Sequence, residues 1–146
     1  MDEPVNPLAR KKRLQELEDE IASLSANINA ATARLLELIR EYDERSGWCD
    51  GFRSCAHWLN WRVGFGLTAA REKVRVAHAL PELPQIGAAF ARGELSYSKV
   101  RAMTRIARPD NEEDLLAVAK AGTAAHVEKL VRCYRRADPE QEQELA

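Results

Sequence analysis

The sequence is poor in the features that mark a membrane or a secreted protein. Its longest uninterrupted apolar run has five residues, 115–119, which is far too short for a membrane span or for the core of a signal peptide. It contains only three cysteines, Cys49, Cys55 and Cys133, and an odd number this small does not make a disulfide framework. These absences predict a protein without a membrane segment that resides in the reducing cytoplasm.

Motifs that carry catalysis or hold a cofactor are also missing. There is no phosphate-binding P-loop, no nucleophile elbow and no dinucleotide-binding glycine turn. The three histidines fall on three different predicted helices, and Cys49, Cys55 and His57 lack the paired cysteine spacing of structural zinc sites. We therefore expect no catalytic residues, no metal, no cofactor and no enzymatic activity.

What the sequence does contain is enough apolar material for a core, together with an uneven distribution of charge. Hydrophobic residues make up 45% and charged residues 31% of the 146 positions, which excludes a chain that is disordered throughout. The net charge is only −1, yet residues 51–108 carry 10 basic against 3 acidic side chains, and the segments on both sides carry an excess of acid. The positive middle segment could attract a polyanion such as DNA, or the acidic flanks could neutralise it.

An unbroken heptad pattern dominates the first third of the chain. Apolar residues alternate at spacings of three and four along a segment without glycine or proline, which predicts one long helix over residues 14–45 with a single apolar seam. The seam consists of Leu14, Leu17, Ile21, Leu24, Ile28, Ala31, Leu35, Leu38 and Tyr42. At 1.5 Å per residue it extends about 43 Å, longer than a small domain is wide.

Two partners for this seam remain open. A second copy of the chain would make a homodimer, with Leu17, Ile21, Leu24, Ile28, Leu35 and Leu38 as the candidate oligomerisation residues. Alternatively, the seam packs against the rest of the same chain. Residues 1–13, which include Pro4 and Pro7, are expected to form a frayed lead-in to the helix.

The segment 46–136 is punctuated like a series of short helices. The predicted caps are Ser54, Thr68, Ser96, Asn111 and Thr123, and the predicted stops are Gly64, Pro81, Gly93, Pro109 and Gly122. No segment alternates like a strand, so the sequence predicts an all-α fold. We expect a long heptad helix, a compact bundle of about five or six short helices over residues 46–136, and a polar tail over residues 137–146. The succession of helix, glycine, cap and helix is also typical of helix-turn-helix units.

Basic residues form a row on each of two predicted helices. One row is Arg71, Arg75 and His78, and the other, on a helix expected to run from Ser96 to Arg108, is Ser98, Arg101, Arg105 and Arg108. Like charges one turn apart are mildly destabilising, which favours a partner that compensates the charge of each row. DNA phosphate would compensate them, which makes these residues the candidate nucleic-acid-binding set. The alternatives are plain solvation, or ion pairs with the acidic first helix through Glu16, Asp19, Glu20, Glu37, Glu41 and Glu44.

The aromatic residues are clustered as well. Six of the nine fall within 24 residues: Tyr42, Trp48, Phe52, Trp58, Trp61 and Phe65. We expect them to supply the main hydrophobic core, because aromatic rings contribute the largest buried areas. Stacking on unpaired bases is the minor alternative.

One long stretch resembles a known family. Its residues are 58–64 (WLNWRVG), 68–80 (TAAREKVRVAHAL), Leu83 with Pro84, and 93–101 (GELSYSKVR). They resemble the bacterial domain-of-unknown-function family 222, and the resemblance runs from about residue 24 to residue 136. It implies the helical region found N-terminal to the zinc-linked nuclease domain of HNH-endonuclease-type proteins. The catalytic histidines of those proteins lie in the nuclease domain, so the resemblance assigns no catalytic residue here.

Together these observations predict a helical, DNA-binding accessory domain without the nuclease domain itself. The alternative is an oligomerisation or scaffold domain that acts through the heptad helix.

Overall fold

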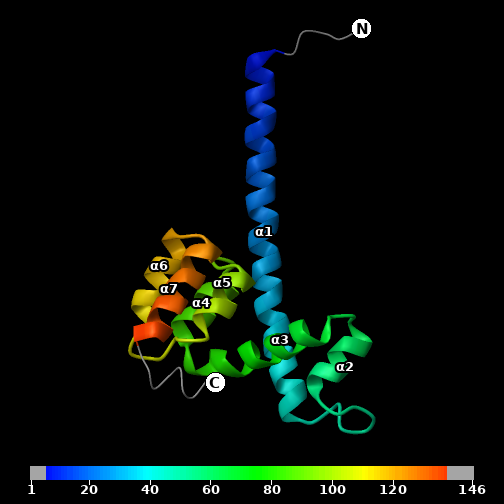
Figure 1. The fold of residues 1–146 in the computed structure, drawn as a ribbon. Coiled ribbons are helices and arrows are strands. Elements are labelled where there is room, and N and C mark those ends of the chain that lie inside the picture. The colour runs from blue at the N-terminus through cyan, green and yellow to red at the C-terminus, as the bar shows by residue number, and fades with distance from the viewer. Residues whose placement is uncertain (1–5, 138–146) are drawn as a thin grey trace.

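The protein is all-α, as predicted. A computed structural model describes residues 6–137, and within that range it contains helices but no strand (Figure 1). The elements in chain order are α1 (Pro7–Glu44), α2 (Cys55–Arg62), α3 (Leu67–Ala79), the 3₁₀ turn η1 (Leu80–Glu82), α4 (Pro84–Ala91), α5 (Tyr97–Met103), α6 (Glu112–Ala121) and α7 (Ala124–Ala137). Apart from Ala137, the predicted polar tail lies outside the described residues.

Helix α1 is much longer than the bundle beside it. Its 38 residues extend about 57 Å, and its N-terminal part stands clear of the other helices in Figure 1. The expected frayed lead-in is wrong for residues 7–13, which are helical. Asn6 caps this end, because its side chain accepts a hydrogen bond from the Leu8 backbone N–H at 3.0 Å, and Pro7 is well suited to the first helical position.

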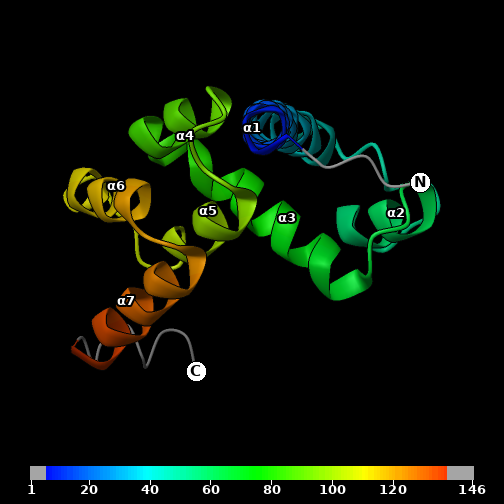
Figure 2. The ribbon, with the colours of Figure 1, turned by 90° about the horizontal axis from the view of Figure 1, so that it is seen from above.

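The remaining helices form a bundle around the C-terminal part of α1. Helix α3 packs against α1, α2 and α5, and α4 packs against α1 and α6. Viewed along α1 in Figure 2, α6 and α7 lie farther from α1 than α4 and α5 do. The core includes the fully buried Leu36, Leu59, Phe90, Val100 and Leu115, one from each of five helices.

The aromatic cluster borders this core rather than filling it, which corrects the expectation from sequence. Tyr42, Trp48, Trp58 and Phe65 are partly buried against it, whereas Trp61 is 68% exposed. The largest fully buried side chain is Phe90, which lies outside the cluster.

Gly93 fixes where α1 meets the bundle. It adopts a φ of 80°, and a Cβ at this position would overlap the backbone carbonyl of Ala26 on α1. Only glycine allows this close approach without strain. The Asn29 side-chain amide also donates to the Gly93 carbonyl at 3.4 Å.

Three of the five predicted caps are confirmed, whereas Thr68 is not a cap and Asn111 precedes α6 without a side-chain cap hydrogen bond. The side-chain oxygens of Ser54, Ser96 and Thr123 each accept a hydrogen bond at 3.3 Å from the backbone N–H three residues later. Thr68 does not cap α3, because the helix begins one residue earlier at Leu67, after Gly66.

Helix α5 ends at Met103, five residues before the predicted end. Local side chains compete for the backbone here: the Thr104 hydroxyl donates to the Arg101 carbonyl at 2.9 Å. The Asn111 side chain donates to the Ile106 carbonyl at 3.1 Å and accepts from the Arg108 N–H at 2.7 Å. Arg105 and Arg108 therefore lie in the turn and loop that follow α5.

Candidate functional site

Helix α1 presents two different apolar faces. Ala33, Leu36 and Ile39 are buried against the bundle and hold the C-terminal part of the helix in place. The heptad seam lies on another face, where five large side chains are each between 45% and 65% exposed: Leu14, Ile21, Leu24, Ile28 and Leu38. An exposed apolar stripe of this length is unusual on a protein surface and is typical of interaction sites.

The bundle covers only the C-terminal end of the seam. Leu35 and Tyr42 pack against the core, Leu17 is partly buried, and Ala31 is exposed. Packing among residues 6–137 therefore leaves most of the predicted seam uncovered.

An apolar groove of about 510 Å³ continues the seam onto α2. Leu35, Leu38 and Tyr42 line one side, and Trp58 and Val63 contribute from α2 and its end. The rings of Tyr42 and Trp58 pack against each other with their centroids 4.3 Å apart and their planes tilted by 36°. Seam and groove thus form one connected apolar surface.

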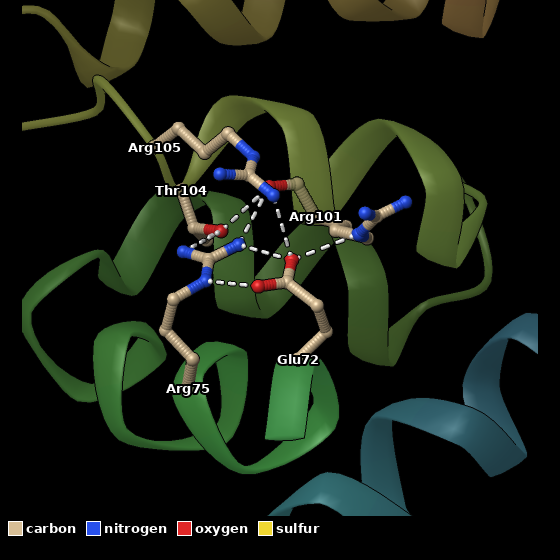
Figure 3. A network of polar contacts seen from close by, with 5 residues as sticks. All are labelled: Glu72, Arg75, Arg101, Thr104 and Arg105. Atoms are coloured by element: carbon tan, nitrogen blue, oxygen red, sulfur yellow. Dashed lines mark hydrogen bonds and ion pairs between the residues drawn. The ribbon is translucent and has the colours of Figure 1, made fainter. Parts of the chain in front are cut away.

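A single carboxylate, Glu72 on α3, gathers three of the predicted arginines (Figure 3). Arg75, one turn along the same helix, donates from Nε to Oε1 at 3.1 Å and from Nη2 to Oε2 at 3.0 Å. Because α3 packs against α5, Arg101 and Arg105 reach the same carboxylate. Arg101 donates from Nε to Oε2 at 2.8 Å, and Arg105 donates from Nη2 to Oε2 at 3.0 Å.

Thr104 completes this arrangement, which we name the Glu72 cluster: Glu72, Arg75, Arg101, Thr104 and Arg105. Arg75 donates from Nη1 to the Thr104 hydroxyl at 3.2 Å and from Nη2 to the Arg101 carbonyl at 3.2 Å. The cluster therefore ties α3 to the end of α5 through both side chains and backbone.

The Glu72 cluster carries more positive than negative charge. Hydrogen bonds from Arg75 and Arg101 and the nearby guanidinium charges outweigh the effect of burial and lower the pKa of Glu72 from 4.5 to about 2. One ionised carboxylate therefore faces three guanidinium groups, which do not lose their protons in proteins. Burial lowers the pKa of Arg105, which is the expected direction for a cation partly removed from water.

The other four residues of the predicted set are not members of the cluster. His78 Nε2 lies 2.6 Å from Asp43 Oδ2 on α1, and Arg71 is exposed beside a hollow that Asp43 also lines. Ser98 is exposed on α5, and Arg108 is exposed in the loop that follows it.

The seven residues therefore do not form two outward ridges. Three of them share Glu72, which lies on α3, so these arginines pair neither with the acidic first helix nor only with water. Glu72 itself was not singled out from the sequence, although its spacing of three residues from Arg75 is the usual signal of a helix ion pair. Nucleic-acid binding by the seven residues stays a prediction.

A family model described as "Domain of unknown function (DUF222)" matches residues 13–142. The chain belongs to this family. No match was found among curated proteins or among solved structures. The matched segment begins inside α1 and includes all later described helices, so the exposed seam and the Glu72 cluster both lie within the DUF222 domain.

The structure of the DUF222 domain also brings in basic residues that sequence reasoning missed. A cleft of about 180 Å³ lies between α5 and α7 and is lined by Arg101 and Arg105 on one side and by Arg132 and Arg135 on the other. A 3.6-residue pattern places Arg132 and Arg135 on a polar face, but only the packing of α7 against α5 sets them beside the cluster.

Metal-binding groups are not assembled in the described part of the chain. Residues 6–137 contain no group of three or more His, Cys, Asp or Glu side chains placed to hold a metal ion. All three cysteines are free; Cys49 and Cys133 are exposed, whereas Cys55 is buried and burial raises its thiol pKa to about 11. Among the described helices, none is both long enough and apolar enough to cross a membrane.

Proposed function

We propose that the protein is a self-association domain whose α1 seam pairs with the seam of a second copy. The observation that carries this proposal is the exposed stripe Leu14, Ile21, Leu24, Ile28 and Leu38 on a helix whose N-terminal part stands clear of its own bundle. A heptad seam is buried by a helix that presents a seam of matching length and spacing. Paired in this way, the domain holds two copies together as a scaffold.

The length of α1 favours a second copy as the occupant. Among the described residues, no helix besides α1 is longer than the 14 residues of α7, whereas the seam runs from Leu14 to Tyr42. Two copies related by a two-fold axis bury the same patch on each chain, so one self-complementary surface is sufficient.

The charges beside the seam are compatible with this pairing. Arg13 pairs with Glu16 at 3.4 Å and Arg34 pairs with Glu37 at 2.9 Å, both within α1. These exposed ion pairs leave the seam itself apolar, and hydrophobic burial is the dominant favourable contribution to most protein association.

The experiment that tests the proposal places charge in the seam without disturbing the bundle. Ile21→Glu with Leu24→Glu introduces two carboxylates at exposed positions, so the single chain should fold as before while pairing is lost. Ala22→Glu with Ser23→Glu is the matched control, because it adds the same charge at exposed positions of α1 outside the seam.

Sedimentation velocity over a concentration series separates the outcomes. The wild-type chain and the control should sediment as dimers, and the seam variant should sediment as a monomer with unchanged helix content. A seam variant that sediments like the control would refute pairing through this surface.

The second candidate function is DNA binding. In this role the protein would be a cytoplasmic accessory domain next to an HNH nuclease domain. The surplus of positive charge in the Glu72 cluster favours it, because nucleic-acid binding rests first on cationic side chains. A helix-turn-helix role for α3 is less well supported. This helix packs against three others, and its Arg75 and His78 are occupied by Glu72 and Asp43.

A further inference from the structure

The cleft between α5 and α7 collects cationic groups from two separate parts of the chain. Arg101 and Arg105 come from α5 and the turn after it, and Arg132 and Arg135 come from α7. Ser98 adds a hydroxyl, and Glu128 is the one acidic side chain among the described residues that line the cleft. Four guanidinium groups therefore surround a cleft of about 180 Å³ that contains one carboxylate.

One buried hydrogen-bond donor on an arginine that lines this cleft lacks an acceptor. Arg135 Nε is buried and has no hydrogen-bond partner among the described residues. Arg101 uses only its Nε on Glu72, and its two terminal nitrogens point away from that carboxylate in Figure 3. Buried polar groups in proteins are nearly always hydrogen-bonded, so a buried guanidinium nitrogen without an acceptor points to a missing ligand.

The charges around the cleft also indicate a missing anionic ligand. Glu72 is already shared by Arg75, Arg101 and Arg105, which leaves it unable to compensate the two arginines of α7 as well. Burial is the largest cause of the lowered pKa of Arg105, and the nearby charges of Arg75, Arg135 and Arg101 lower it further, so these cations repel one another. An anion in the cleft would relieve this repulsion.

We propose that the cleft between α5 and α7 binds a phosphate group through Arg101, Arg105, Arg132 and Arg135. The planar guanidinium fork matches phosphate oxygens in pairs, and several oxygens on one centre can accept from both walls of the cleft. The cleft is also smaller than the pockets that enclose drug-sized ligands, which suits one phosphate group at the surface. The phosphate belongs either to a free phosphate ester or to a nucleic-acid backbone.

This inference does not depend on self-association, and it gives the second candidate function a specific site. The site uses Arg101 and Arg105 of the predicted set and adds Arg132 and Arg135. Glu128 limits the affinity, because its carboxylate repels the bound anion from one side of the cleft.

Calorimetric titration with inorganic phosphate tests the site directly, with sodium chloride holding the ionic strength constant. The wild-type chain should bind phosphate saturably. Arg132→Ala with Arg135→Ala should weaken binding about 100-fold, since each charge-assisted contact contributes about ten-fold. Arg53→Ala with Arg62→Ala is the matched control, because it removes the same charge from exposed positions outside the cleft and should bind like wild type.

If the double variant Arg132→Ala with Arg135→Ala fails to fold, a single substitution still tests the site. Arg132→Gln changes only an exposed side chain and should weaken phosphate binding about ten-fold on its own. Absence of saturable binding by the wild-type chain, or equal weakening in the Arg53 and Arg62 control, would overturn the inference.

Fluorescence anisotropy with duplex DNA identifies the source of the phosphate. DNA binding that falls in the Arg132 and Arg135 variant together with phosphate binding supports a nucleic-acid backbone in this cleft. Phosphate binding without DNA binding confirms the phosphate site and indicates a free phosphate ester as its ligand. This result would exclude DNA binding as a function of the cleft. The Ile21 and Leu24 seam variant should bind phosphate like wild type, so failure of self-association and failure of this site are separate results.

Discussion

Replacing Glu72 by glutamine should destabilise the protein by about 2 kcal/mol near neutral pH, and this loss should disappear in acid. Glu72 has a side chain that is 19% exposed and accepts hydrogen bonds from three arginines, so glutamine would leave three guanidinium groups around a neutral amide. The lowering of its pKa from 4.5 to about 2 sets an upper limit of about 3 kcal/mol, since one pKa unit equals 1.36 kcal/mol. Screening on the open side of the cluster reduces this to about 2 kcal/mol.

The direction of the pH dependence follows from the lowered pKa. A carboxylate whose pKa is lower in the folded than in the unfolded state contributes its full stabilisation above the unfolded value of 4.5. That contribution is lost as the pH falls through the folded value of about 2. The difference in stability between wild type and Glu72→Gln should therefore be constant near neutral pH and close progressively in acid.

Urea unfolding at a fixed protein concentration measures this difference at each pH. Comparing the two proteins isolates Glu72, because every other carboxylate titrates in both. Glu94→Gln is the control: its partners Arg92, at 3.0 Å, and Lys120, at 3.6 Å, are exposed, so loss of these ion pairs should have a much smaller effect. Equal stability of wild type and Glu72→Gln near pH 7, or a difference that persists unchanged in acid, would refute the reasoning.

Three further predictions concern the bundle. Glu112→Ala should cost about 2–4 kcal/mol in urea unfolding, because this 2% exposed carboxylate accepts the hydrogen bond from an α4 backbone N–H at 2.7 Å. Gly93→Ala should lower the melting temperature more than Gly64→Ala, since both have positive φ but only Gly93 meets a neighbouring backbone; equal shifts would contradict the close approach to α1. Cys55 should react with a thiol-alkylating reagent far more slowly than Cys49 in the folded protein, because it is buried and its pKa is about 11, and equal rates would disprove its burial.

Sequence reasoning captured the features that depend on local spacing. The heptad pattern predicted the long helix, and Ser54, Ser96 and Thr123 marked the starts of short ones because a cap acts on backbone groups only three residues away. The early end of α5 was missed, since Thr104 and Asn111 compete for the backbone in a stretch that contains no glycine or proline before Pro109.

The candidate sites needed information that spacing does not contain. Helical periodicity placed Arg75 and Arg101 on polar faces. It could not show that the two faces meet around Glu72, because Arg101 lies 29 residues after Glu72 in the chain. The packing of α7 against α5 is a similar long-range contact, and it alone sets Arg135 beside Arg105. For the seam, in contrast, the pattern alone placed Leu14, Ile21, Leu24, Ile28 and Leu38 on one face, and these side chains are exposed; their role in oligomerisation stays a prediction.

The most direct test of self-association through α1 is the molar mass of the wild-type chain. Sedimentation equilibrium over a concentration series should give twice the monomer mass of 16.4 kDa, and dilution should lower the average mass toward that of the monomer. A mass of 16.4 kDa at every concentration would contradict the account, because the exposed seam Leu14, Ile21, Leu24, Ile28 and Leu38 would then have no second copy to bury it.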